Sequence, residues 1–261
     1  MDSREGKARA VLVDLDDTIV AFDSVARPSW IEVLGALRAE WGGRPTDEAL
    51  VALERRAAEY WADPDRHRRG RMNLLAARKT IIRGALRDLG LPDRGVADRT
   101  ARLYESVRTA RIHLLPGAVA ALEAMRAAGL LVGLVTNGTK DSQGEKISRF
   151  GLEVHVDQVF IEGTLPYGKP DPRIYQHAIT ALGTAPETTW MIGDNWEWEV
   201  AAPRRLGLTT VWVRRGDRPL PDPEALGDGP PVYATPSLGA TLGWWDGSVP
   251  LPPPVVPARV S

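Results

Sequence analysis

An uninterrupted apolar run near the start of the chain ends abruptly in acidic residues. Residues 10–13 read Ala-Val-Leu-Val, and Asp14, Asp16, Asp17 and Thr18 follow within the next five positions. A short run that is apolar at consecutive positions is typical of a strand buried on both faces of a parallel sheet. Ligands of open α/β sheets bind at the carboxyl ends of the strands, so the pattern predicts that Asp14 and Asp16 lie at a site.

Asp14 and Asp16 stand two positions apart in the sequence. Side chains at this spacing point to the same side of an extended chain, so the two carboxylates could share a divalent cation. One Asp can attack an electrophile and form a covalent intermediate, while a second carboxyl protonates the leaving group and then activates water. The alternative is a plain acidic turn, because Asp and Thr are common in turns and at helix N-caps.

The composition narrows the possible functions. The 261 residues include 33 Lys and Arg against 34 Asp and Glu, and no Cys. A net charge of −1 gives no global field for nucleic acid or an anionic membrane, and without Cys there are no disulfides, thiolate nucleophiles or Cys-ligated zinc. No segment approaches the roughly 20 apolar residues that span a bilayer. We therefore expect a cytoplasmic protein with neither nucleic-acid nor membrane partners; the oligomeric state stays open.

Helical and strand-like patterns occupy different parts of the chain. From about residue 29 to residue 111 the apolar residues recur at helical spacing, and no strand signal interrupts them. Later apolar segments, typical of buried strands, alternate with helical patterns; they cover residues 130–135, 154–161, 190–193 and 209–213. This alternation predicts an α/β fold with a doubly wound parallel sheet, into which an all-helical domain is inserted.

The domain boundaries follow from these patterns. We expect an α/β core from residues 1–22 and 112–218, and a helical insert from residues 23–111. Past Arg218 the composition changes, because 11 of the 21 prolines lie there. Proline at this density is typical of extended, irregular chain. Residues 219–261 are therefore predicted to form an extension with neither regular helix nor sheet.

The segment VLVDLDDTIV at residues 11–20 resembles the first motif of the haloacid dehalogenase superfamily, in which DxDx[TV] follows an apolar strand. The second motif of that superfamily is a hydroxyl at the end of the next strand, and here Thr136-Asn137-Gly138 follows the second predicted strand. The third motif is matched almost letter for letter by GKPDP at residues 168–172, which contains Lys169.

The fourth motif is where the chain departs from the superfamily. The motif commonly reads GDxxxxD, with both acids serving a metal site, whereas residues 193–199 read GDNWEWE. Asp194 keeps the first acid, and Glu199 takes the place of the second. A carboxylate one methylene longer can serve Mg²⁺ through water or shift the coordination. The alternative is that Asp194 caps the next helix and Glu199 faces solvent.

The resemblance implies a Rossmann-like core with a helical cap domain, and a Mg²⁺-dependent phosphatase that acts on a small phosphorylated metabolite. Asp14 is implied as the nucleophile that forms an aspartyl-phosphate. Asp16 is implied as the acid that protonates the leaving alkoxide and then deprotonates water. The residues implied in substrate binding are Thr18, Thr136, Asn137 and Lys169, and those implied in metal binding are Asp14, Asp16, Asp194 and Glu199.

Other functions fit parts of the same pattern. A phosphoglucomutase-type phosphotransferase uses the same four motifs and differs in what accepts the phosphoryl group. A 2-haloacid dehalogenase uses the first Asp but lacks the second, so Asp16 argues against it. A non-catalytic binding domain could keep the fold alone, although it would not need the full set of motifs. Within the superfamily, TNGTKDSQGEKI at residues 136–147 looks closest to the nucleotidase-like and acylneuraminate-phosphate phosphatase branch.

A basic run lies within the predicted helical insert. Residues 65–71 read Asp-Arg-His-Arg-Arg-Gly-Arg, the densest cationic run in a chain of almost zero net charge. Such a run can simply be a solvated helix face. Alternatively, side chains such as Arg68 and Arg69 hold the non-reacting end of the substrate, because the planar guanidinium binds carboxylates and phosphates in bidentate fashion.

Overall fold

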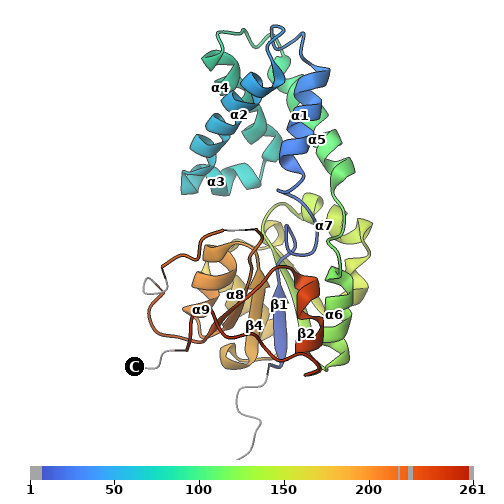
Figure 1. The fold of residues 1–261 in the computed structure, drawn as a ribbon, viewed down its shortest axis with the longest axis vertical. Helices are drawn as coiled ribbons and strands as arrows, with labels where there is room; N and C mark the ends of the chain where they lie inside the picture. The colour runs from blue at the N-terminus through green and yellow to red at the C-terminus, as the bar shows by residue number, and fades with distance from the viewer. Residues whose placement is uncertain (1–7, 217, 223–225, 259–261) are drawn as a thin grey trace, which may run out of the picture. The chain divides into compact units, whose positions relative to one another are not determined.

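The computed structural model describes residues 8–216, 218–222 and 226–258 (Figure 1). The chain forms two compact units. One unit combines the residues up to Ala21 with those from Leu114 onward, and the other is Phe22–His113. Among the described residues, no helix is both long and apolar enough to cross a membrane.

A six-stranded parallel sheet forms the centre of the first unit, with the order β3-β2-β1-β4-β5-β6. The strands are β1 (Ala10–Val13), β2 (Leu131–Thr136), β3 (Gln158–Ile161), β4 (Thr189–Gly193), β5 (Thr209–Val213) and β6 (Val232–Thr235). Val13 of β1 lies opposite Leu134 of β2 and Ile192 of β4. The carboxyl ends of these three strands are therefore level, which gathers the residues that follow them. The predicted α/β fold with a doubly wound parallel sheet is confirmed.

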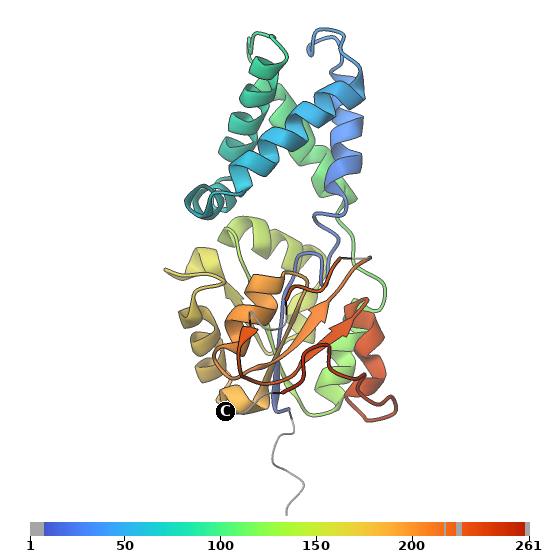
Figure 2. The ribbon, with the colours of Figure 1, turned by 60° about the vertical axis from the view of Figure 1, so that its left-hand side comes forward.

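Helices cover both faces of this sheet (Figure 2). The α-helices of this unit are α6 (Ala118–Ala127), α7 (Lys140–Arg149), α8 (Pro172–Ala181) and the short α9 (Ala202–Arg204). On one face, apolar residues of α8 such as Ile174 and Tyr175 pack against Leu12, Val135 and Met191 of the sheet. The sequence sets the start of α8, because Asp171 is its N-cap and Pro172 its first residue.

Shorter helical turns complete the connections of the unit. Those of 3-10 type are η1 (Leu152–His155), η2 (Glu162–Thr164), η3 (Pro186–Thr188) and η6 (Leu238–Trp244), and η4 (Trp196–Ala201) is a π-helix. Because η1 occupies the start of the apolar stretch 154–161, the strand there begins only at Gln158.

The segment past Arg218 corrects one prediction. We expected neither regular helix nor sheet there, yet β6 extends the sheet and pairs in parallel with β5. The prolines do not prevent this, because Pro230 and Pro231 precede the strand and Pro236 follows it. The buried guanidinium of Arg204 also holds the preceding loop, donating to the carbonyl oxygens of Pro230, at 2.8 Å, and of Gly227, at 2.9 Å.

The second unit, Phe22–His113, is helical wherever its structure is regular. Its helices are α1 (Ala26–Ala36), α2 (Thr46–Trp61), α3 (Pro64–Arg71), α4 (Leu74–Asp88) and α5 (Val96–Arg111). Leu53 of α2, Ile82 and Leu86 of α4, and Ala101 of α5 belong to its buried core. Glycine and proline mark two of the breaks between these helices, because Gly42 has a positive φ of 66° and Pro64 begins α3.

Candidate active site

Polar side chains gather at the carboxyl ends of three adjacent strands. Asp14 follows β1, Thr136 is the last residue of β2, and Asp194 follows β4. The N–H of Asp14 donates to the Ile192 carbonyl oxygen at 2.9 Å, so the ladder between β1 and β4 continues into the site. The acids that the sequence placed at strand ends thus lie at one edge of the sheet.

The ammonium of Lys169 lies at the centre of the site. Its Nζ is 2.6 Å from Asp14 Oδ1 and 2.7 Å from Glu199 Oε1, and it donates to the Val135 carbonyl oxygen at 2.8 Å. Lys169 is fully buried, and the side chains of Asp14 and Glu199 are nearly so. The second oxygen of Asp14, Oδ2, accepts a hydrogen bond of 3.1 Å from the Thr18 hydroxyl. The site therefore places one buried cation between two buried carboxylates.

Asn137 fixes the main chain that carries Lys169. Its Nδ2 donates to the Lys169 carbonyl oxygen at 2.7 Å, and its Oδ1 accepts from the Lys169 N–H at 2.8 Å. Both polar ends of the amide are engaged in this way. The side chain of Asn137 therefore positions Lys169, and its part in substrate binding stays a prediction.

Burial and charge both act on the ionisable groups of this cluster. Burial raises the pKa of Asp14, against the opposing effect of Lys169. Burial likewise raises the pKa of Glu199 to about 8, although Lys169 acts to lower it. Burial alone would lower the pKa of Lys169, but Asp14 and Glu199 outweigh this effect and raise it above its usual value. The ammonium therefore stays charged, while the two carboxylates compete for it.

A second polar cluster surrounds Asp16. Lys146 Nζ lies 2.5 Å from Asp16 Oδ1 and 2.6 Å from Oδ2, so the ammonium contacts both oxygens. Gln143 Nε2 donates to Asp16 Oδ2 at 3.1 Å and to the Thr136 hydroxyl at 2.9 Å. Our predictions did not include Gln143 or Lys146. What marks these two residues is that they are polar, buried and three positions apart in a polar helix. Burial cannot be seen in the sequence.

Glu199 occupies a buried position that its surroundings explain. A Cβ atom on Gly193 would overlap the Glu199 side chain, so the glycine of the fourth motif makes room for this acid. Glu199 Oε2 accepts a hydrogen bond of 2.8 Å from the Asn195 N–H. The alternative reading, in which Glu199 faces solvent and Asp194 caps the next helix, is wrong, because Glu199 is 1% exposed and Asn195 is the N-cap of η4.

The chemistry of the donors at this edge suits a hard cation. Asp14, Asp16 and Asp194 supply carboxylate and carbonyl oxygens, which Mg²⁺ prefers. Asp194 lies near enough to Glu199 for its charge to act on that carboxyl, and its Oδ2 lies 3.4 Å from Arg218 Nη1. The carboxylate of Asp14 contacts Lys169. Among the described residues, no three acidic or imidazole side chains lie close enough together to form a metal site. The residues fit Mg²⁺ by donor type.

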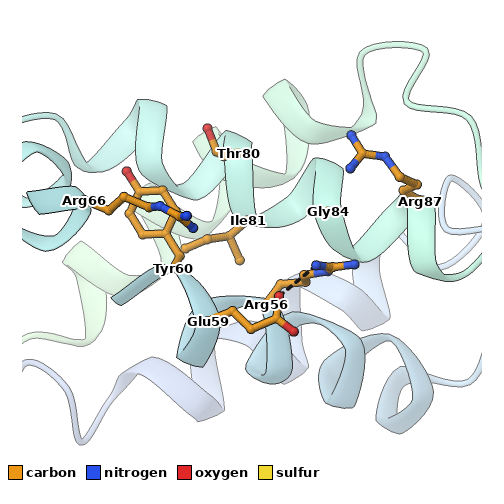
Figure 3. A pocket seen from close by; sticks show the side chains of 8 residues that line it. All are labelled: Arg56, Glu59, Tyr60, Arg66, Thr80, Ile81, Gly84 and Arg87. Carbon is orange, nitrogen blue, oxygen red and sulfur yellow. Dashed lines mark hydrogen bonds and ion pairs between the residues drawn. The ribbon is translucent and has the colours of Figure 1, made fainter. Parts of the chain in front are cut away.

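Arg68 and Arg69 belong to α3 of the helical unit, and both are exposed. Arg68 Nη2 lies 3.3 Å from Asp65 Oδ1, and both side chains are mostly exposed, so this pair contributes little to stability. Arg66 of the same basic run lines a cavity of about 230 Å³ between α2, α3 and α4. Figure 3 shows Arg66 toward one end of this cavity and Arg87 toward the other.

Residues 8–207 match the family described as haloacid dehalogenase-like hydrolases. The chain belongs to this family. The superfamily predicted from the four motifs is therefore confirmed. The matched residues include the cluster around Lys169 and the cluster around Asp16.

Two relatives align with this hydrolase over most of its length. It is 39% identical to a phosphoserine phosphatase of Thermus thermophilus over 76% of this chain and 72% of the relative. It is 28% identical to a glyceraldehyde 3-phosphate phosphatase of Methanopyrus kandleri, over 80% of this chain and 84% of the relative. The predicted class of enzyme, a phosphoric monoester hydrolase, is confirmed by these matches.

A solved structure supports the same fold for this hydrolase. The hydrolase YfnB of Bacillus subtilis, crystallised with magnesium, superposes with a TM-score of 0.69. The match covers 92% of this chain and 99% of that one, at 19% identity. Identity at this level speaks for the fold alone.

Proposed function

We propose that this protein is a Mg²⁺-dependent phosphatase that hydrolyses a small phosphorylated metabolite through an aspartyl-phosphate on Asp14. The observation that supports this most is the setting of Asp14. Its carboxylate is buried at the end of β1, bonded to Lys169 and Thr18, with a second acid two residues further on. A carboxylate held in this way is a preorganised nucleophile beside a cation that can stabilise an anionic transition state.

The proposed reaction has two displacements at phosphorus. In the first, a carboxylate oxygen of Asp14 bonds to phosphorus, the bond to the leaving oxygen breaks, and Asp16, which enters this step protonated, gives that oxygen its proton. In the second, Asp16 takes a proton from water, whose oxygen attacks phosphorus and releases Asp14. Lys169 and the hydroxyl groups of Thr18 and Thr136 bind and orient the phosphoryl oxygens. The products are phosphate and an alcohol.

In this proposal Mg²⁺ is held by Asp14, the main-chain carbonyl of Asp16 and Asp194. When bound, it supplies positive charge that screens the repulsion between an anionic nucleophile and an anionic substrate. Glu199 contributes through Lys169, which it contacts at 2.7 Å, and stays a candidate ligand through water. Asp17, whose Oδ1 lies 3.0 Å from Arg215 Nη1, has no proposed part in the chemistry.

The proposed function is tested with p-nitrophenyl phosphate and the purified protein. We expect phosphate release that requires added Mg²⁺ and stops with excess EDTA. The absence of release with Mg²⁺ present would contradict a phosphatase. Transfer of the phosphoryl group to an added sugar phosphate, in preference to water, would instead assign a phosphoglucomutase-type transferase.

The helical unit gives a prediction about specificity. If Arg68 and Arg69 hold the non-reacting end of the substrate, Arg68→Ala or Arg69→Ala should lower kcat/KM for that substrate by about tenfold while sparing p-nitrophenyl phosphate. The substrate is first chosen from a panel that includes phosphoserine and glyceraldehyde 3-phosphate, on which the relatives are named to act. Arg94→Ala, in the loop before α5, is the matched control. Equal losses of kcat/KM on both substrates would show that the basic run is a solvated helix face without a part in specificity.

A further inference from the structure

Two buried polar side chains on α7 have no part in the mechanism described so far. Gln143 and Lys146 are three residues apart, so they lie on the same face of the helix. Gln143 is 3% exposed and Lys146 5%. Most of α7 is polar, and the buried face consists of these two residues together with Ile147. Burying an ammonium and an amide is costly unless each finds partners.

Both side chains find these partners at the active site. The Lys146 ammonium contacts both carboxylate oxygens of Asp16, at 2.5 and 2.6 Å. Gln143 Nε2 donates to Asp16 and Thr136, and also to the Asn137 carbonyl oxygen. The carboxylate and the carbonyl can only accept hydrogen bonds, so they fix which end of the amide faces the site. One helix thereby links the acid after β1 to the hydroxyl that ends β2.

We infer that Gln143 and Lys146 are positioning residues that hold Asp16 and Thr136 for both chemical steps. The inference rests on the proposed function, in which Asp16 moves a proton in each step and Thr136 contacts the phosphoryl group. The Asp16 side chain is 23% exposed and could otherwise rotate, whereas a buried ammonium on both oxygens fixes the carboxylate plane. A misplacement of about 1 Å can cost about 10²-fold in rate.

Lys146→Met removes the ammonium and keeps most of the side-chain volume. We expect a kcat at least about tenfold lower with p-nitrophenyl phosphate and a larger loss with a simple alkyl phosphate, whose leaving group depends more on a proton from Asp16. KM for p-nitrophenyl phosphate should fall along with kcat, because the phosphoenzyme accumulates when its hydrolysis slows. With p-nitrophenyl phosphate, the fraction of enzyme trapped as aspartyl-phosphate by acid quench should rise, because the water-activating step needs Asp16 while departure of p-nitrophenolate does not.

Three further variants separate positioning from folding. Lys146→Arg keeps a cation and should recover part of the lost kcat. Gln143→Leu removes the second support and should also raise the trapped fraction. Lys140→Met changes an exposed lysine at the start of the same helix and should behave as wild type. Circular dichroism and thermal unfolding report whether each variant folds; if Lys146→Met does not, the Arg and Leu variants decide.

Several outcomes overturn the inference. A Lys146→Met enzyme with wild-type kcat on both substrates shows that Asp16 needs no support from α7. Equal losses on both substrates with an unchanged trapped fraction indicate that Lys146 only anchors the helix. If wild-type activity requires Asp14 in either case, the proposed function stands and the inference alone is wrong. If the wild type neither releases phosphate nor forms a phosphoenzyme, both are wrong.

Discussion

Replacing Asp14 with Asn should lower kcat for phosphate release by on the order of 10⁴-fold or more while leaving the protein folded. The amide keeps the shape of the side chain and an oxygen that can accept from Lys169 Nζ, at 2.6 Å in the wild type. It lacks the nucleophilic carboxylate, so the first displacement cannot occur. Steady-state turnover and acid-quench trapping measure the two consequences, because the variant should also form no phosphoenzyme.

A matched control makes the Asp14 result specific. Asp141→Asn changes an exposed acid in the first turn of α7 and should keep wild-type turnover. Near wild-type turnover by a folded Asp14→Asn protein would remove Asp14 as the nucleophile, and with it the proposed mechanism.

Lys169→Met is expected to lower both activity and stability. Its ammonium neutralises Asp14 and Glu199, which are 6% and 1% exposed. Removing one partner of a buried ion pair leaves the other charges uncompensated and costs about 3 to 5 kcal/mol of unfolding free energy. The loss of the cation that faces the phosphoryl group should lower kcat by about 10²- to 10³-fold. Denaturant titration and steady-state kinetics measure the two effects separately.

A second substitution, at Glu199, separates the effect of Lys169 on stability from its effect on activity. Adding Glu199→Gln to Lys169→Met replaces one unpaired carboxylate with a neutral amide, so the double variant should regain at least about 1 kcal/mol of stability. It should regain no activity, because the cation is still missing. Lys140→Met, an exposed lysine, is the control for the loss of a positive charge. A Lys169→Met protein as stable as wild type would show that the buried carboxylates are neutralised by other means.

Much of the fold and part of the site could be predicted because they depend on local sequence. The apolar run of β1 ends in Asp14 and Asp16, and the parallel sheet then brings other strand ends beside them. The likeness of GKPDP to the third superfamily motif marked Lys169, whose ammonium indeed lies against Asp14. These inferences need only the order of the strands and the direction in which they run.

The remaining features depend on three-dimensional details that the sequence does not display. Glu199 lies in the π-helix η4 and contacts Lys169, and neither the irregular helix nor the contact can be seen in the sequence. Lys146 finds Asp16 only once the start and packing of α7 are fixed. The strand β6 was missed because proline density hides a four-residue edge strand whose own residues include no proline.

The place of the helical unit between β1 and β2 has a consequence for folding during synthesis. Phe22–His113 is contiguous, so the ribosome delivers a complete helical core before any partner strand of β1 has been made. The apolar residues of β1 stay unpaired until β2 and then β4, which flank β1 in the sheet, have been synthesised. Such an unpaired strand is prone to aggregate. We therefore expect nascent chains whose helical unit has just left the ribosome to carry an unprotected β1 that chaperones recognise.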